Sequence, residues 1–240
     1  MRYGFISDIH GNLEGLSACL AELADRDVDE YWCLGDVVGY MADPRECIKV
    51  VRELGATVVA GNHDQAAIGK ASTEYFNEYA RRAIEWTAGE LTEKERAFLD
   101  SLPLVEVGEH FTAVHATLEE PEEWNYVRST FEAHRNLELS ERPMIFYGHS
   151  HVPIWFQDDR GCRYYHDPHI ELSDGSRYMI NVGSSGQPRD GDPRAACAVY
   201  DTEEGEVDII RVEYDIEKTQ AKVTEAGLPP VLALRLERGE

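Results

Sequence analysis

The sequence predicts an α/β protein, and two observations carry this prediction. Over the first 65 residues, apolar runs and amphipathic segments alternate in the order strand, helix, strand, helix, strand. Beyond Val152, short apolar segments separated by Gly and Pro clusters replace this alternation. Strands joined by helices form parallel sheets, whereas short strands joined by turns pair antiparallel. We therefore expect a single α/β domain over residues 1–240, whose part beyond residue 151 is rich in strands and ends in one or two helices.

The elements of the first third follow from local signals. Apolar residues recur at helical spacing from Leu13 to Ala24. Asp43-Pro44 predicts a helix through Leu54, with Asp43 as N-cap and Pro44 at the first helical position. The expected strands are Tyr3–Ser7, Tyr31–Leu34 and Thr57–Ala60.

The middle and last thirds are less regular. Residues 72–102 have a helical pattern that is punctuated by Gly89 and stopped by Pro103. Residues 104–107 and 110–115 are expected to pair antiparallel around Gly108-Glu109, and residues 117–127 to form a surface loop. A short helix is expected at 130–137. The remaining expected strands are 144–147, 154–157, 177–182, 196–201 and 207–214.

Composition limits the possible partners. The net charge is −23, from 46 acidic and 23 basic residues, so most of the surface should repel nucleic acid. No apolar run approaches the roughly 20 residues of a membrane-spanning helix, and the amino terminus does not resemble a signal peptide. The five scattered cysteines form no C-x-x-C pair. We expect a cytoplasmic protein that does not enter membranes; the sequence does not indicate an oligomeric state.

Polar side chains gather directly after five of the predicted strands. In an open parallel sheet, ligands bind beyond the carboxyl ends of the strands, so these segments should meet at one place. Each side chain alone is more typical of a turn or a cap, but five of the nine histidines lie in these segments. The side chains are Asp8, His10, Asn12, Asp36, Asn62, His63, Asp64, His115, His149 and His151.

These residue types indicate a metal centre. Imidazole, carboxylate and amide groups without thiolate suit divalent ions such as Mn, Fe, Zn, Ni or Co, with Mn the first choice. The candidate ligands outnumber those that one tetrahedral ion accepts. Two ions could share these ligands with one bridging carboxylate, for which Asp36 is the candidate, and two-metal sites recur in phosphate-ester hydrolysis.

The order of these motifs resembles that of the calcineurin-like metallophosphoesterases. "DIHGN", "GD" at Gly35-Asp36, "GNHD", His115 and "GHSH" match the family pattern D-x-H, G-D, G-N-H-[D/E], H, G-H-x-H across residues 8–151. The segment "MINVGSSGQPRDGDPRAACAVYD" is similar to the carboxyl half of bacterial members. The resemblance implies a four-layer αββα sandwich of two mixed β-sheets flanked by helices.

The resemblance also implies roles for individual residues. By this match one ion is held by Asp8, His10, Asp36 and His151, and the other by Asp36, Asn62, His115 and His149. A hydroxide between the ions would attack phosphorus in line with the leaving oxygen. His63 would lie near the leaving group, as its general acid or as a donor to the phosphate. Asp64 would orient that imidazole or cap the following helix.

The chain departs from the family pattern at the second motif. Protein phosphatases of the superfamily continue it as "GDxVDRG", in which the arginine grips phosphate and the aspartate supports the motif-three histidine. Here Gly39 and Tyr40 occupy those two positions. This argues against a close copy of the protein serine/threonine phosphatases and of the symmetric dinucleotide hydrolases that share that arginine. If a cation binds the phosphate oxygens, it is another one: Arg189 or Arg194 is the candidate, and the alternative role of such an arginine is to neutralise Asp190 and Asp192. The loop 117–127, with Trp124 and Tyr126, forms either a wall or lid for a base or another apolar group, or a plain surface loop with aromatic anchors.

Two functions remain after this comparison of motifs. The first is a dinuclear-metal-dependent phosphoesterase that hydrolyses a small phosphodiester, phosphomonoester or nucleotide. The alternative is a non-catalytic metal-binding scaffold that acts through protein contacts, as the retromer subunit of this fold does after losing its motif-three histidine. This chain retains His63 and all eight matched positions, which favours the enzyme. A nucleic-acid polymer is a poor substrate candidate because of the acidic surface.

Overall fold

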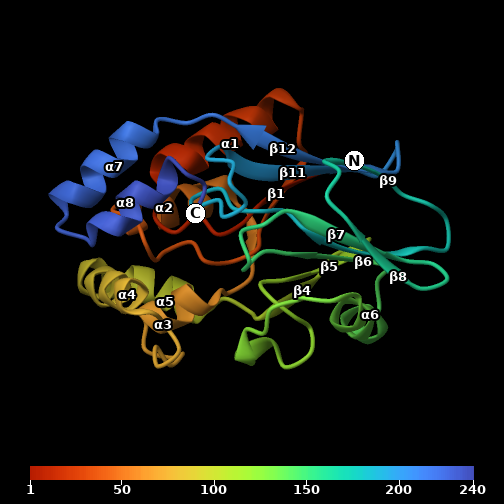
Figure 1. Cartoon of the computed structure of the whole chain (residues 1–240), viewed down its shortest axis with the longest axis horizontal. Helices are drawn as coiled ribbons and strands as arrows, with labels where there is room; N and C mark the ends of the chain where they lie inside the picture. Colours follow the sequence, from red (N-terminus) through yellow and green to blue (C-terminus); the bar gives the residue numbers. More distant parts are fainter.

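The computed structural model describes residues 1–240 and contains two six-stranded mixed sheets with helices on their outer faces (Figure 1). The first sheet has the order β3-β2-β1-β11-β12-β9. In it β1, β2 and β3 are parallel, while β11 and β12 pair antiparallel beside them. Its strands are β1 (Arg2–Ile6), β2 (Glu30–Cys33), β3 (Thr57–Val58), β9 (His169–Glu171), β11 (Ala195–Asp201) and β12 (Glu206–Val212).

The second sheet has the order β4-β5-β6-β10-β7-β8. Its centre is parallel, because β6 pairs in parallel with both β5 and β10. The sandwich of two mixed sheets implied by the family resemblance is thus confirmed. The strands are β4 (Val105–Val107), β5 (Phe111–Val114), β6 (Met144–Tyr147), β7 (Ile154–Asp158), β8 (Cys162–Tyr165) and β10 (Arg177–Asn181).

Helices cover the outer faces of both sheets. α1 packs on β11 and β12 of the first sheet, and α6 packs on β7, β8 and β10 of the second. In Figure 1, α7 and α8 lie beside α1 and α2, on the side of the molecule away from β8 and β9. The helices are α1 (Leu13–Asp25), α2 (Pro44–Leu54), α3 (Asn62–Ala67), α4 (Glu78–Glu90), α5 (Glu93–Asp100), α6 (Thr130–Leu139), α7 (Ile216–Glu225), α8 (Pro230–Leu236) and the 3₁₀ turn η1 (Pro121–Glu123).

An aromatic core joins the two sheets. Phe5 on β1 stacks on Phe146 on β6 with ring centroids 3.9 Å apart, and Phe111 on β5 meets both rings edge-on. All three side chains are buried. Burial of such rings contributes about 1.5–3 kcal/mol each, before the added gain from their geometry. This core fixes the ends of β1 and β6 relative to each other.

Several predicted boundaries were wrong for local reasons. The helical pattern of 72–102 is two helices, α4 beginning after Asn77, whose side chain caps it, and α5 beginning after Thr92. Gly89 lies inside α4 and does not end it. The third strand is shorter than predicted, and β8 and β9, two short strands at sheet edges, were not predicted. Asp43 occupies the N-cap position of α2 without a capping hydrogen bond, because its carboxylate pairs with Lys222 instead.

No helix has the length and apolar character required to cross a membrane.

Candidate metal centre

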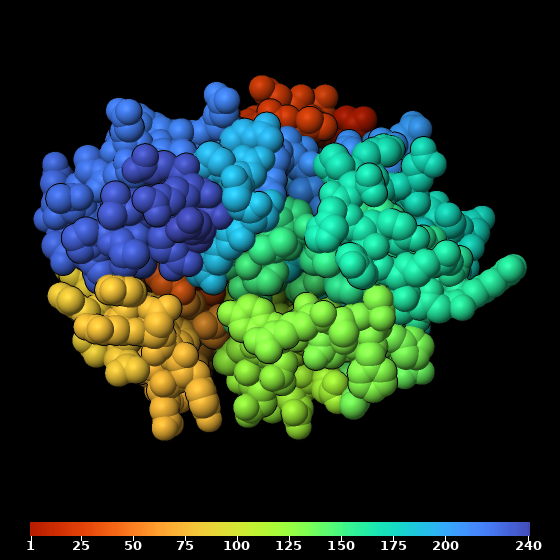
Figure 2. Space-filling view, in the orientation of Figure 1, coloured from red at the N-terminus to blue at the C-terminus, as the bar shows by residue number.

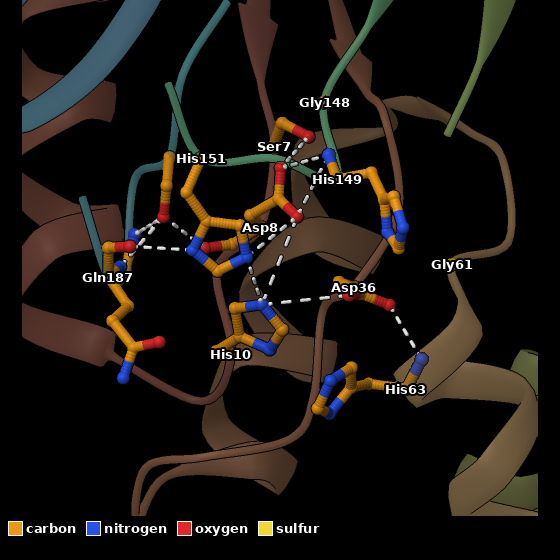
Figure 3. Close-up of polar contacts among 12 residues, drawn as sticks. Ser7, Asp8, His10, Asp36, Gly61, His63, Gly148, His149, His151 and Gln187 are labelled. Carbon is orange, nitrogen blue, oxygen red and sulfur yellow. Dashed lines mark hydrogen bonds and ion pairs between the residues drawn. The ribbon is translucent and has the colours of Figure 1, made fainter. Parts of the chain in front are cut away.

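The side chains that follow β1, β2, β3, β5 and β6 converge at one end of the sandwich. Parallel strands carry them there: Asp8 and Asp36 follow neighbouring strands of the first sheet, and His115 and His149 follow neighbouring strands of the second. Figure 3 shows several of them facing one another. We call this group the candidate metal centre; it consists of Asp8, His10, Asp36, Asn62, His115, His149 and His151, and all seven residues are buried.

One half of the candidate metal centre surrounds Asp8. The Nε2 atoms of His10 and His151 are 3.0 Å apart. His151 Nε2 lies 3.3 Å from Asp8 Oδ1, and His10 Nε2 lies 3.6 Å from Asp36 Oδ2. Two carboxylates and two imidazoles therefore direct ligand atoms at one small space.

The other half surrounds His115. Its Nε2 atom lies 3.4 Å from Asp36 Oδ2, 3.2 Å from Asn62 Oδ1 and 3.2 Å from His149 Nδ1. The same oxygen of Asp36 thus faces His10 on one side and His115 on the other. Asp36 lies between the two halves, as expected of a shared ligand.

Backbone carbonyls hold three of these imidazoles from behind. Nδ1 of His10 bonds to the carbonyl of Val38 at 3.2 Å, and Nδ1 of His115 to that of Leu34 at 2.7 Å. Nδ1 of His151 bonds to the Gln187 carbonyl at 2.6 Å. A carbonyl accepts only from N–H, so each bond places a proton on Nδ1 and directs Nε2 into the centre. Metal-binding histidines are typically oriented in this way.

The residues present fit a divalent cation. Unprotonated Nε2 atoms and carboxylate oxygens are all acceptors, so they cannot satisfy one another when brought together in a buried place. His149 directs its Nδ1 atom at the same space, 3.2 Å from His115 Nε2. Acceptor atoms buried together without donors are costly, and a cation bound to their lone pairs would remove the cost. The donor set of nitrogen and oxygen without sulfur suits borderline divalent metals.

The electrostatics of the isolated side chains agree with this fit. Burial alone would raise the pKa of Asp8 and Asp36, but the neighbouring histidines outweigh it and lower both values. Burial lowers the pKa of His10 well below its usual range, and that of His149 to about 3. His115 is the exception, because the two aspartates overcome its burial and raise its pKa to about 9. Carboxylates are therefore ionised here, and His10 and His149 are neutral, as ligands must be.

The backbone around the candidate metal centre adopts conformations that are rare for residues other than glycine. Asp8, His10, Asp36, His149 and His151 all have φ between 50° and 67°. Such left-handed residues gather at functional sites, where surrounding structure must hold them. Glycines make the close approach possible: a Cβ on residue 61 would lie 2.1 Å from an Asp36 oxygen, and one on residue 148 would lie 2.3 Å from an Asp8 oxygen.

Comparison with known proteins identifies the family. The calcineurin-like phosphoesterase superfamily domain matches residues 1–205. This chain belongs to that superfamily. It is 40% identical to an uncharacterized protein of Methanocaldococcus jannaschii over 238 residues, which are 98% of this chain and 96% of the relative.

Solved structures agree with this assignment. The crystal structure of a metallophosphoesterase from Sphaerobacter thermophilus is similar with a TM-score of 0.89 and 41% identity, covering 100% of this chain and 99% of the other. A hypothetical protein of Pyrococcus horikoshii, 20% identical, shares the fold with a TM-score of 0.82 over 100% of this chain and 98% of its own.

One further sequence relative matches only a short stretch. A symmetrical bis(5'-nucleosyl)-tetraphosphatase of Pectobacterium atrosepticum is 39% identical over 62 residues only, 25% of this chain and 22% of that enzyme.

The motif-three histidine, His63, lies beside the candidate metal centre and is held by aromatic packing. Its ring centroid is 4.6 Å from that of Tyr40, 4.7 Å from that of Phe76 and 4.7 Å from that of His10. Its backbone N–H donates to Asp36 Oδ1 at 2.8 Å, whereas its Nδ1 has no hydrogen-bond partner. Burial lowers the pKa of His63 to about 4, against the opposing effect of Asp36.

Of the two roles that the sequence left open for Asp64, orienting the His63 imidazole or capping the following helix, the hydrogen bonds of its carboxylate support the cap. The Asp64 carboxylate accepts from the backbone N–H groups of Val38 at 3.1 Å and Gly61 at 3.0 Å. It caps α3, but from the third helical position and not from the N-cap itself, which is Gly61. The reason is local: α3 begins at Asn62, and Asp64 is the third residue of its first turn, so its side chain points back to the backbone N–H of the N-cap, Gly61. Burial and the nearby Asp36 raise the pKa of Asp64 to about 7.

The loop after β5 forms a wall of the candidate metal centre. The Trp124 ring meets His115 with centroids 5.9 Å apart, and the Tyr126 ring lies 4.3 Å from His149. Trp124 also lines two hollows, of about 280 and 590 Å³, outside the centre. In Figure 2, a hollow separates the yellow surface that includes α4 from the green surface around residue 120, and atoms of the amino-terminal segments lie at its floor. The wall was one of the two readings that the sequence left open.

Arg189 lies in the loop between β10 and β11, and its charge acts on Tyr126 of the wall as well as on two histidines. Its guanidinium carbon is 5.4 Å from the centre of the Tyr40 ring, and its positive charge helps to lower the pKa of both His63 and His151, after the larger effect of burial. For Arg189 the alternative role of neutralising aspartates is not observed, because Asp190 pairs with Arg211 and Asp192 pairs with Arg194.

Sequence reasoning missed two residues at this site. Ser7 donates from its hydroxyl to Asp8 Oδ2 at 2.6 Å, and Gln187 supplies the carbonyl behind His151. Both are fully buried polar residues. The only signal in the sequence was their position: Ser7 directly precedes the first motif, and Gln187 lies inside the segment "GSSGQPRDG".

Proposed function

We propose that this protein is a divalent-metal-dependent phosphoesterase that hydrolyses small phosphate esters. The observation that carries the proposal is that two ionised aspartates and the Nε2 atoms of three histidines converge. A backbone carbonyl holds each of these three imidazole rings from behind. Membership of the phosphoesterase superfamily supports the same reaction class.

Two ions would be held with Asp36 between them. Asp8, His10 and His151 complete one set of ligands, and Asn62, His115 and His149 the other; manganese is the first candidate for both sites. Bound divalent ions would supply Lewis acidity, which lowers the pKa of water and offsets charge on phosphoryl oxygens. The backbone carbonyls bonded to Nδ1 would keep the Nε2 atoms of the imidazoles directed at the ions.

His63 would act on the substrate as a neutral donor. With a pKa of about 4 its imidazole is uncharged near pH 7, so it carries one N–H and no spare proton. This favours a hydrogen bond to the phosphate or the leaving oxygen over transfer of a proton, two roles that the sequence left open. Arg189 would supply positive charge to the non-bridging oxygens, because Tyr40 replaces the arginine of the second motif.

The substrate is proposed to be small. A net charge of −23 offers no extended basic surface for a nucleic-acid chain. The wall of Trp124 and Tyr126 would suit a base or another apolar group on the ester. The short similarity to a dinucleoside tetraphosphatase supports including dinucleoside polyphosphates among the substrates to be tested.

Metal removal and restoration test this proposal. Protein treated with a chelator and then supplied with Mn²⁺ should regain activity against a panel of phosphomonoesters, phosphodiesters, dinucleotides and cyclic nucleotides. Asp36→Asn should lose at least about 100-fold in turnover, more than the 10–100-fold typical of residues behind the ligands, while circular dichroism stays unchanged. Turnover without metal, or full activity of Asp36→Asn, would contradict the proposal. Metal binding without turnover of any ester would favour the non-catalytic scaffold.

A further inference from the structure

We infer that Gln187 is a positioning residue, which holds the guanidinium of Arg189 toward a bound phosphate without neutralising its charge. The inference rests on the proposed function and adds to it the residue that makes Arg189 available. Gln187 Oε1 accepts from two nitrogens of Arg189, Nη2 at 2.8 Å and Nε at 3.2 Å. The same residue's carbonyl fixes His151, so one residue joins the candidate metal centre to the guanidinium.

The orientation of the Gln187 amide follows from its partner. Arginine has only donors, so the oxygen of the amide must face it and the NH₂ group must point away. At that position Nε2 is buried without any hydrogen-bond partner, and the whole residue is fully buried. Leaving a buried donor unpaired costs free energy. In this orientation the amide nonetheless presents a neutral oxygen to Arg189. Figure 3 shows the Gln187 side chain lying beside His151 and His10.

The charge of Arg189 is free in a protein where acidic groups are abundant. No carboxylate oxygen lies within 4 Å of its guanidinium, whereas Arg194 and Arg211, from the same region, each pair with an aspartate. A glutamate at position 187 would bind the guanidinium more strongly than glutamine does, because such hydrogen bonds are charge-assisted. It would also cancel the positive charge. Glutamine therefore gives a held but uncompensated cation.

The Tyr40 ring completes the arrangement. Arg189 lies over one part of the ring, and His10 and His63 lie against it with centroids 4.6 Å away in both cases. A guanidinium over an aromatic ring keeps its outer N–H groups available to a planar or tetrahedral anion. The cation thus stands beside His63 although Tyr40 occupies the position of the missing arginine. The ligand class is the phosphate group of an ester, or inorganic phosphate.

Gln187→Glu gives the decisive test, because stability and phosphate binding should move in opposite directions. The substitution keeps the acceptor for Arg189, removes the unpaired N–H and cancels the charge. We expect an equal or higher melting temperature in the metal-free protein. The affinity of the Mn-loaded protein for inorganic phosphate, measured by calorimetry, should fall at least about tenfold, since hydrogen bonds to charged groups are among the stronger ones. A structural role alone would not separate the two measurements.

A double-mutant cycle provides the second measurement. Gln187→Met removes the acceptor with little change in size and should weaken phosphate binding in the presence of Arg189 but not in an Arg189→Ala background. The control is Gln157→Ala on β7, which removes hydrogen bonds to Ser176 and Tyr178 far from the centre and should leave phosphate binding unchanged. Metal content is measured for each variant.

The possible outcomes separate this inference from the proposed function. Phosphate binding by Gln187→Glu at the wild-type level, equal effects of Gln187→Met with and without Arg189, or no phosphate binding by the wild type would each overturn the inference. Wild-type protein that binds phosphate as described but hydrolyses no ester would overturn the proposed function and leave the inference standing. Wild-type protein that hydrolyses esters, together with variants of Gln187 that bind phosphate normally, would support the proposed function and overturn the inference.

Discussion

The buried and the exposed histidines of this chain differ in what holds their rings. His10, His115 and His151 donate from Nδ1 to backbone carbonyls and direct Nε2 at one another and at the aspartates. His134 and His169 lie on the surface, about half exposed, and pair directly with carboxylates. A neutral carbonyl fixes a ring without competing for its lone pair, whereas a carboxylate favours the protonated ring. Burial lowers the pKa of His10 and His151, whereas carboxylates raise the pKa of His134 and His169 on the surface. His115 combines both situations, because burial lowers its pKa but Asp36 and Asp8 raise it to about 9, and a bound cation would have to displace a proton from it.

The largest effect is expected from removing a histidine of the first kind. His115→Ala should lower the affinity for Mn²⁺ at least about 100-fold, because it deletes a nitrogen that faces Asp36, Asn62 and His149 together. The matched variant His169→Ala should leave metal affinity unchanged. Calorimetric titration with Mn²⁺ measures both, and circular dichroism checks the fold. Equal metal affinities in the two variants would remove the distinction between the buried and exposed histidines.

His63 sharpens the comparison because it is buried but held by neither a carbonyl nor a carboxylate. His63→Ala should retain both ions and lose about 10²–10³-fold in turnover, the range typical of a lost donor to a transition-state oxygen. If the neutral N–H is what matters, His63→Gln should recover part of this loss, since glutamine also donates. Loss of metal from His63→Ala would instead make it a ligand. Equal turnover of the Gln and Ala variants would favour proton transfer.

The position of the candidate metal centre could be predicted from sequence because it depends on strand direction alone. Once β1, β2 and β3 are parallel, the residues after Ile6, Cys33 and Val58 must emerge at the same edge, whatever the intervening helices do. The helix starting at Pro44 was equally predictable, because proline fits the first helical position. These features are set by short stretches of chain.

The partners of individual polar groups could not be predicted in the same way. The contact of Gln187 with His151, 36 residues away, depends on how the chain between β10 and β11 crosses from the second sheet to the first. The edge strands β8 and β9 have a single buried residue between them, Ile170, and are defined mainly by the strands they pair with. Long-range packing, and not local pattern, decides such contacts.

Asp64 gives the smallest expected effect and tests whether the residue next to His63 belongs to the site or to the fold. Asp64→Asn keeps the size of the side chain but offers one oxygen where the two N–H groups of Val38 and Gly61 now find two. One buried donor is then left unpaired, at a cost of about 1–3 kcal/mol. For a chain of this length each kcal/mol lowers the melting temperature by about 2–4 °C, which scanning calorimetry measures. Turnover at saturating metal should change by less than a few-fold, because the carboxylate does not contact the imidazole. A fall in turnover as large as that of His63→Ala, without loss of stability, would return Asp64 to the catalytic group and place a charged support behind His63 after all.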